Sequence, residues 1–104
     1  MAQEVIWSYE AVEDLESIAA YISRDSEFYA ASLVEEVMAA TRVLVKFFEM
    51  GRVVPEFEDC AIREIFVEEY RIIYSIEKMR IDVLGIIHGR RDLKKLWKKE
   101  KRGK

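Results

Sequence analysis

The sequence predicts an α+β fold in which a helical hairpin packs on a small antiparallel sheet. Three observations lead to this prediction. Apolar residues recur at spacings of three and four in the first half of the chain, they alternate with period two in the second half, and a loop containing Gly51 and Pro55 separates the halves. These periods are those of helices and strands, so the expected order is β-α-α-β-β-β followed by a short C-terminal helix.

The first half of the chain supplies one strand and two helices. Residues 4–9, EVIWSY, form a short apolar run that we expect to be a strand. Residues 11–22 have the spacing of an amphipathic helix, with acidic side chains in the first turns. Ser26 can cap a second helix, whose apolar spacing continues to about Phe48. The short break between the two patterns predicts an antiparallel hairpin.

The second half supplies three strands and the terminal helix. Residues 62–67, 70–76 and 81–88 are rich in isoleucine, valine and tyrosine, and their connections are short enough for hairpins. We therefore expect an antiparallel meander. Apolar residues then stand at helical spacing within residues 91–99, where Trp97 is expected to dock on the sheet.

Composition and length restrict the class of protein. A chain of 104 residues, 51% apolar and 36% charged, is expected to form one soluble globular domain. The single cysteine, Cys60, cannot form an internal disulfide or complete a zinc set. The acidic N-terminal segment does not resemble a signal peptide, and no segment has the length of a membrane span. We expect a cytoplasmic protein with no membrane partner, no metal and no cofactor.

The charges are divided unevenly along the chain. Residues 1–88 carry 18 acidic and 8 basic side chains, whereas residues 89–104 carry 2 acidic and 9 basic ones. We divide the chain into a domain of residues 1–93 and a basic C-terminal tail of residues 94–104. Such a tail can bind a nucleic-acid backbone, bind an acidic protein surface, or simply remain solvated.

Several segments, in this order and spacing, resemble the RelE/ParE superfamily of toxins from type II toxin–antitoxin systems. The matching segments are the helical pattern of residues 11–22, Gly51-Arg52-Val53-Val54-Pro55-Glu56, Ile62-Arg63-Glu64-Ile65, Tyr70-Arg71-Ile72-Ile73-Tyr74 and Ile87-His88-Gly89-Arg90-Arg91-Asp92. The resemblance implies a toxin neutralised by a small cognate antitoxin, which in this family lays a helix and an extended segment over the toxin's apolar surface. The expected assembly is a toxin–antitoxin hetero-oligomer. Aromatic side chains such as Phe28, Phe47, Phe66 and Tyr74 are expected to fill the core or the antitoxin groove.

Two activities are found in this superfamily. RelE-like members are ribosome-dependent ribonucleases that cut messenger RNA, whereas ParE-like members poison DNA gyrase and are not nucleases. Cutting RNA requires a base, an acid and cations around the phosphate. If the chain is RelE-like, and therefore an enzyme, its catalytic residues would be Arg71, His88, Arg90 and Arg91.

Each of these residues also has a structural interpretation. His88 stands at the end of a buried strand, where it can form a local hydrogen bond that orients the following turn. Arg71 and Arg63 can form ion pairs across neighbouring strands with Glu64 or with the glutamates of the following turn.

The departures from the RelE pattern favour the ParE-like activity. Glu64 stands close to where a second cation is expected, and no tyrosine follows Arg91. A carboxylate near the scissile phosphate would repel it. The prediction is a gyrase-poisoning toxin whose partners are an antitoxin and DNA gyrase. The alternatives are a messenger-RNA endoribonuclease that acts with the ribosome, and an inactive or purely protein-binding member.

Overall fold

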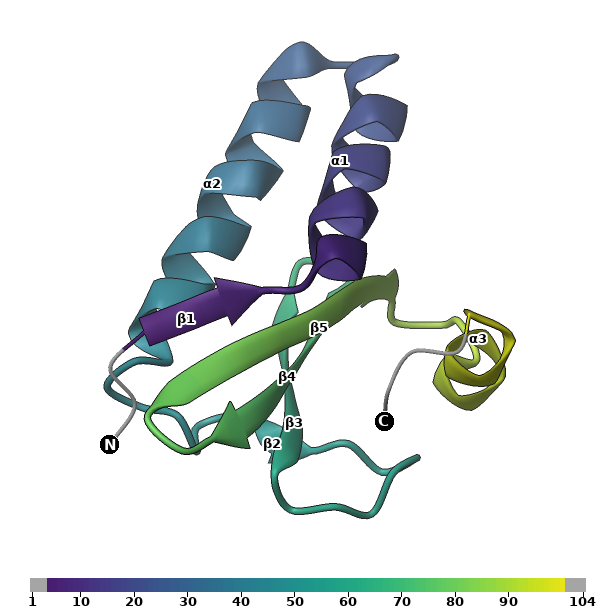
Figure 1. The fold of residues 1–104 in the computed structure, drawn as a ribbon. Helices are drawn as coiled ribbons and strands as arrows, with labels where there is room; N and C mark the ends of the chain where they lie inside the picture. Colours follow the sequence, from purple (N-terminus) through teal and green to yellow (C-terminus); the bar gives the residue numbers. More distant parts are fainter. Residues whose placement is uncertain (1–3, 101–104) are drawn as a thin grey trace.

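The structure is a five-stranded sheet with a helical hairpin on one face and a short helix on the other (Figure 1). The computed structural model describes residues 4–100. The elements in chain order are β1 (Glu4–Trp7), α1 (Tyr9–Ser23), α2 (Glu27–Val43), β2 (Arg52–Val53), β3 (Ile62–Val67), β4 (Tyr70–Glu77), β5 (Arg80–His88) and α3 (Leu93–Glu100). The predicted α+β fold and the predicted C-terminal helix are confirmed.

Serine side chains start both helices of the hairpin. Ser8 Oγ accepts a hydrogen bond from the backbone N–H of Ala11 at 3.0 Å, and Ser26 Oγ accepts one from Tyr29 at 3.1 Å. Each bond satisfies a donor that the first helical turn leaves unpaired, which is worth about 1 kcal/mol. The predicted cap at Ser26 is therefore confirmed.

The second helix is shorter than the sequence predicts. It ends at Val43 rather than near Phe48, because hydrogen bonds between residues three apart replace the helical pattern from Leu44 onward. In this tighter turn Leu44 becomes fully buried, whereas Phe47 is turned outward. The apolar spacing continued past the end of the helix and gave no sign of the change.

The sheet has the strand order β1-β5-β4-β3-β2. The antiparallel meander of β3, β4 and β5 is as predicted, and two outer strands extend it. On one edge β1 pairs in parallel with β5, so that Glu4 lies opposite Arg80. On the other edge the two residues of β2, which the sequence placed in a loop, pair with β3. A two-residue strand is too short to show a period, so its pairing could not be predicted.

Adjacent residues of β4 reach the two faces of the sheet. Ile72 packs into the cluster beneath the hairpin, together with Ala11 and Val37, and Ile73 packs into the cluster beneath α3. Both isoleucines are fully buried. The central strand is therefore covered on both sides, which explains its continuous apolar run.

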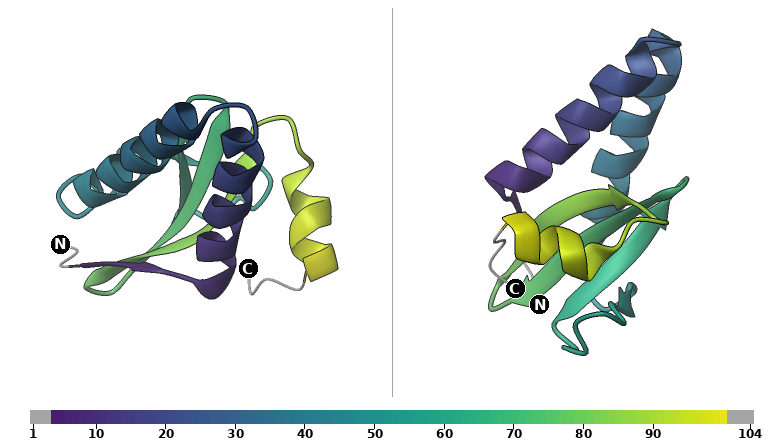
Figure 2. Two further views of the ribbon diagram at one scale, coloured as in Figure 1. Left: turned by 90° about the horizontal axis from the view of Figure 1, so that it is seen from above. Right: turned by 90° about the vertical axis from the view of Figure 1, so that its right-hand side faces the viewer.

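The terminal helix α3 covers the face opposite the hairpin (Figure 2). Leu93, Leu96 and Trp97 are buried, and the Trp97 ring lies 5.9 Å from the ring of Phe57. The Asp92 carboxylate caps the helix by accepting a hydrogen bond from the backbone N–H of Lys95 at 3.0 Å. The predicted docking of Trp97 is confirmed, and the apolar side of α3 belongs to the core.

Tyr74 fixes the chain that follows the hairpin. Its hydroxyl donates a hydrogen bond to the carbonyl of Phe48 at 2.8 Å and accepts one from the N–H of Gly51 at 3.1 Å. A Cβ atom at Gly51 would lie 2.6 Å from both the Tyr74 hydroxyl and the carbonyl oxygen of Glu64. Only glycine fits at this position, because the loop passes directly against the sheet.

Several aromatic side chains lie at the surface rather than in the core. Phe28 is 77% exposed, and Phe47 and Phe66 are more than half exposed, whereas Tyr74 is fully buried. Phe28, Phe47 and Phe66 were expected to fill either the core or the antitoxin groove. The first of these two predictions is wrong, because all three are exposed. They remain available to a partner.

Candidate functional site

Glu64 is the centre of a charge network on the α3 side of the sheet. Its buried carboxylate accepts hydrogen bonds from Nε of Arg71 and from Nε of Arg52, both at 2.5 Å. Glu56 accepts two further bonds from the Arg71 guanidinium, at 2.9 and 3.0 Å. A buried carboxylate without such partners would be costly, so the network is what allows Glu64 to stand inside the protein.

Arg71 is held by this network. Its side chain is only 5% exposed, and the hydrogen bonds with Glu56, followed by those with Glu64, raise the pKa of its guanidinium. In return, the hydrogen bonds from Arg71 lower the pKa of the Glu56 carboxyl. The ion pair predicted between Arg71 and Glu64 is confirmed, whereas Arg63 instead donates to backbone carbonyls. A phosphate could reach Arg71 only by displacing a carboxylate.

His88 lies on the hairpin side of the sheet. It is opposite Tyr70 in the strand register, and the two rings meet edge to face with centroids 5.7 Å apart. Its Nδ1 accepts a hydrogen bond from the backbone N–H of Arg90 at 3.2 Å, and its Nε2 lies 3.6 Å from a carboxylate oxygen of Glu69. The local hydrogen bond expected from the structural interpretation of His88 is confirmed.

The sheet separates the predicted catalytic residues. Tyr70 packs against the hairpin cluster, and Arg71 is the next residue of the same strand, so their side chains point to opposite faces. His88 shares the face of Tyr70. Arg90 and Arg91 follow the strand end and have exposed side chains. The four residues therefore do not surround a common point at which a phosphate could sit.

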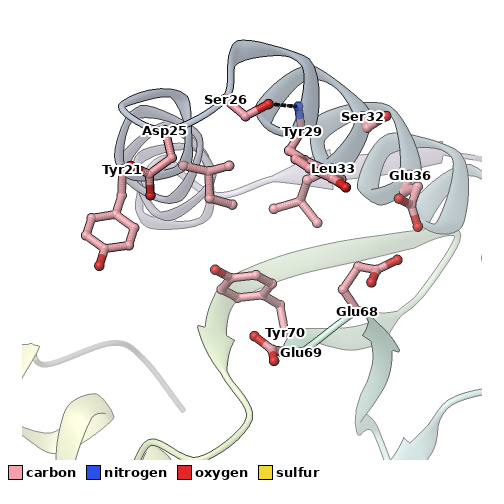
Figure 3. A pocket seen from close by; sticks show the side chains of 11 residues that line it. Tyr21, Asp25, Ser26, Tyr29, Ser32, Leu33, Glu36, Glu68, Glu69 and Tyr70 are labelled. Atoms are coloured by element: carbon pink, nitrogen blue, oxygen red, sulfur yellow. Dashed lines mark hydrogen bonds between the residues drawn. The ribbon is translucent and has the colours of Figure 1, made fainter.

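A groove of about 520 Å³ opens between the hairpin and the β3–β4 turn (Figure 3). It is lined by Tyr21, Ile22, Asp25, Ser26, Tyr29, Ser32, Leu33, Glu36, Glu68, Glu69 and Tyr70. Carboxylates and tyrosines dominate this lining, which contains no lysine, arginine or histidine. Ile22 and Leu33 contribute apolar surface to the lining, and Leu33 points toward the sheet (Figure 3). The groove suits an amphipathic segment that carries basic side chains.

The negative charge of the groove is visible in its titrating groups. Loss of hydration, followed by a hydrogen bond with Glu68, raises the pKa of the Glu36 carboxyl. Burial, followed by the charge of Glu69, raises the pKa of the Tyr70 hydroxyl. Groups in the groove therefore resist negative charge, and a cation placed there would relieve the repulsion.

Two further features bear on the type of protein. Within residues 4–100, no helix combines the length and the apolar character that crossing a membrane requires. In the same described part of the chain, no group of three or more histidine, cysteine or acidic side chains is placed to hold a metal ion.

Comparison with known protein families identifies the family of the chain. The family model described as the ParE toxin of the type II toxin–antitoxin system, parDE, matches residues 5–93. The chain belongs to the ParE toxin family. The predicted resemblance to the RelE/ParE superfamily, on its ParE side, is confirmed.

A solved structure shows the same fold. The chromosomal ParDE toxin–antitoxin system from P. aeruginosa contains a chain that matches with a TM-score of 0.68 and 20% sequence identity. The match covers 85% of this chain and 96% of that one. No curated protein matches this ParE family member in sequence at a significant level.

The sequence did not reveal the groove of this ParE family member. Tyr21, Tyr29 and Glu36 stand in the two predicted helices, and Glu68 and Glu69 in a predicted hairpin connection. Only the fold brings the three segments together. No pattern within any one of these segments indicates the groove.

Proposed function

We propose that this member of the ParE toxin family inhibits growth by poisoning DNA gyrase and is neutralised by a cognate antitoxin. The family match supports the toxin role. The observation that carries the choice of gyrase is the placement of Arg71 and His88 on opposite faces of the sheet. A gyrase poison needs a contact surface, whereas a nuclease needs a base and cations at one phosphate.

The surroundings of the cations support the same choice. Arg71 already binds two carboxylates, and Glu64 would face any phosphate brought to it. The Nδ1 of His88 accepts a backbone hydrogen bond, so this nitrogen is occupied in the folded chain. A RelE-like reaction would require both side chains to leave these partners and meet.

The groove on the hairpin side is the surface we propose for the antitoxin. Its rim carries exposed aromatic side chains, with Tyr21 and Tyr29 each 68% exposed. Exposed apolar surface of this kind marks protein interaction sites. The carboxylates would pair with basic side chains of the antitoxin, so the predicted complex is a toxin–antitoxin hetero-oligomer.

Expression in a bacterial host tests the mechanism. We expect arrested growth, accumulation of gyrase-linked DNA breaks and uncut transcripts, with growth restored by co-expression of the antitoxin gene. With purified gyrase, the protein should raise the amount of trapped cleavage product.

His88→Ala separates the two activities, and Arg24→Ala, in the exposed turn between α1 and α2, is its control. We expect both variants to retain toxicity, because neither side chain has a chemical step to perform. Ribosome-dependent cutting of transcripts that disappears in His88→Ala alone would establish the nuclease instead. Normal growth with soluble, folded protein would contradict any toxin role.

A further inference from the structure

The outward side of α3 and the turn that precedes it carry a block of cations that the proposed function does not use. The block consists of Arg90, Arg91, Lys94, Lys95, Lys98 and Lys99. All six side chains are exposed. With the carboxylates of the described residues, none of the six forms an ion pair. We call these six residues the α3 cation block.

Three arginines of the body are engaged differently. Arg52 and Arg71 bind Glu64, and Arg80 binds Asp82 with N–O distances of 2.7 and 3.2 Å. Carboxylates of the same molecule neutralise the charge of these three arginines. The charge of the α3 cation block is not neutralised in this way, so it is available to an external anion.

The four lysines of the block stand on a helix that is held in place. The opposite side of α3 is buried through Leu93, Leu96 and Trp97, which fixes the rotation of the helix about its axis. Lysines four residues apart lie one above the other, so the four lysines form two rows with a spacing of about 6 Å along the axis. The cations are thus presented as an array and are not carried on a flexible tail.

Helix stability accounts for only part of this array, because the helix dipole favours Lys98 and Lys99 in the last turn but not the lysines of the first turn. Like charges four residues apart repel each other. Lys94 and Lys95 also stand in the first turn of α3, where the helix dipole favours anions. A bound polyanion would relieve both effects, because it would place negative charge along the rows.

The chemistry of the surface indicates which polyanion. No large apolar side chain is exposed between Arg90 and Lys99. Protein interfaces place apolar and aromatic side chains at their centre and are depleted in lysine, whereas contact with a phosphate backbone needs cations alone. We propose that the α3 cation block binds the phosphate backbone of duplex DNA without reading its sequence.

The distribution of charge over the molecule is compatible with DNA binding at the α3 cation block. The acidic groove is lined by residues of the hairpin and of the β3–β4 turn. The helix α3 covers the opposite face of the sheet (Figure 2). Duplex DNA carries about one charge per 1.7 Å of its axis, a higher density than a single strand offers. The inference goes beyond the proposed function and does not depend on it, since the binding requires neither gyrase nor antitoxin.

Fluorescence anisotropy with a labelled 20-base-pair duplex tests the proposal on the full-length protein. If all six cations contact phosphates, the affinity should fall by about a thousandfold between 50 and 200 mM salt. Lys94→Gln/Lys98→Gln should reduce the slope of log affinity against log salt concentration by about 2. It should also weaken binding at 50 mM salt by about tenfold or more. Glutamine has nearly the helix propensity of lysine, so α3 is expected to persist.

Lys46→Gln/Lys78→Gln is the matched control. It removes the same charge from two exposed positions on the body, and we expect the salt slope to remain unchanged. Circular dichroism checks that each variant is folded. Should Lys94→Gln/Lys98→Gln fail to fold, Lys95→Gln/Lys99→Gln tests the second row in the same way.

Four results would overturn the proposal. The first is no binding of the duplex at 50 mM salt, and the second is an equal loss of affinity in the variant and the control. The third is displacement of the duplex by polyglutamate more readily than by unlabelled duplex, which would identify an acidic protein as the partner. The fourth is tighter binding of a 20-nucleotide single-stranded RNA.

Discussion

The two faces of the sheet are closed in different ways. On the hairpin side, Ile72 and Val83 pack against α1 and α2 in an entirely apolar cluster. On the α3 side, the apolar cluster of Ile73 stands beside the charge network of Glu64 and Arg71. One face has an apolar cluster with no network of paired charges beside it, and the other combines apolar packing with paired charges.

This difference separates stability from specificity. Apolar packing on the hairpin side contributes stability, and it tolerates a change of side-chain shape as long as the total volume is kept. A buried ion pair contributes little net stability, but it strongly penalises any arrangement that leaves one charge alone. The α3 side therefore defines the position of the β2 and β3 strands, since Glu64 must meet Arg52 and Arg71 together.

The largest effect is expected from breaking the network. Arg71→Ala leaves the buried Glu64 carboxylate with one partner, and the free energy of unfolding should fall by about 3–5 kcal/mol. Urea denaturation measures this loss. Replacing both charges, in Glu64→Leu/Arg71→Met, should recover most of it. A loss below about 1 kcal/mol in Arg71→Ala would show that the network does not constrain the fold.

Two neighbouring isoleucines provide a comparison of the faces. Ile72→Ala and Ile73→Ala each remove a fully buried side chain, so each should cost about 2–5 kcal/mol. The two substitutions are expected to differ in their effect on α3. Hydrogen exchange should show reduced protection of α3 only in Ile73→Ala, because only Ile73 contacts that helix cluster. Equal loss of α3 protection in both variants would mean that the faces are not independent.

The smallest effects on stability are expected from a change of pH. They have opposite signs for Glu56, which pairs with Arg71, and for Glu36 in the groove. The lowered pKa of Glu56 means that its pairing with Arg71 stabilises the fold above the unfolded pKa of about 4.3, and that this contribution disappears as the pH falls through the folded value. Glu56→Gln should therefore flatten the acid side of the stability curve. The measurement is the unfolding midpoint between pH 2 and pH 7.

The raised pKa of Glu36 acts in the other direction. Protonation of this carboxyl stabilises the fold below its unfolded pKa, and the contribution is lost as the pH rises through the folded value. Glu36→Gln should thus raise the unfolding midpoint slightly at pH 7 and leave the acid side unchanged. A lower midpoint at pH 7 would contradict the repulsion inferred for the groove.

Much of the fold follows from periodicity in the sequence. The helices at residues 11–22 and beyond Ser26, the meander and the apolar edge of α3 all have enough residues to show a period. The end of α2 at Val43 could not be predicted, because apolar spacing continues into the turn where Leu44 enters the core. The same is true of β2, whose two residues pair only because β3 is beside them.

The candidate site was less accessible from the sequence. The Arg71–Glu64 pair was one of several charge pairings across neighbouring strands, and strand register decided among them. The separation of His88 from Arg71 depends on which face each residue takes, and a one-residue change of register would reverse it. The groove unites α1, α2 and the β3–β4 turn, which are distant in the sequence.

The parallel pairing of β1 with β5 has a consequence for synthesis of the chain. Glu4 lies opposite Arg80, and the Asp14 carboxylate accepts a hydrogen bond from the backbone N–H of Ile86 at 2.9 Å. The first strand thus obtains its partner strand, and the first helix its hydrogen bond to the sheet, only after β5 has emerged from the ribosome. A nascent chain is therefore expected to lack the complete sheet until β5 has been synthesised.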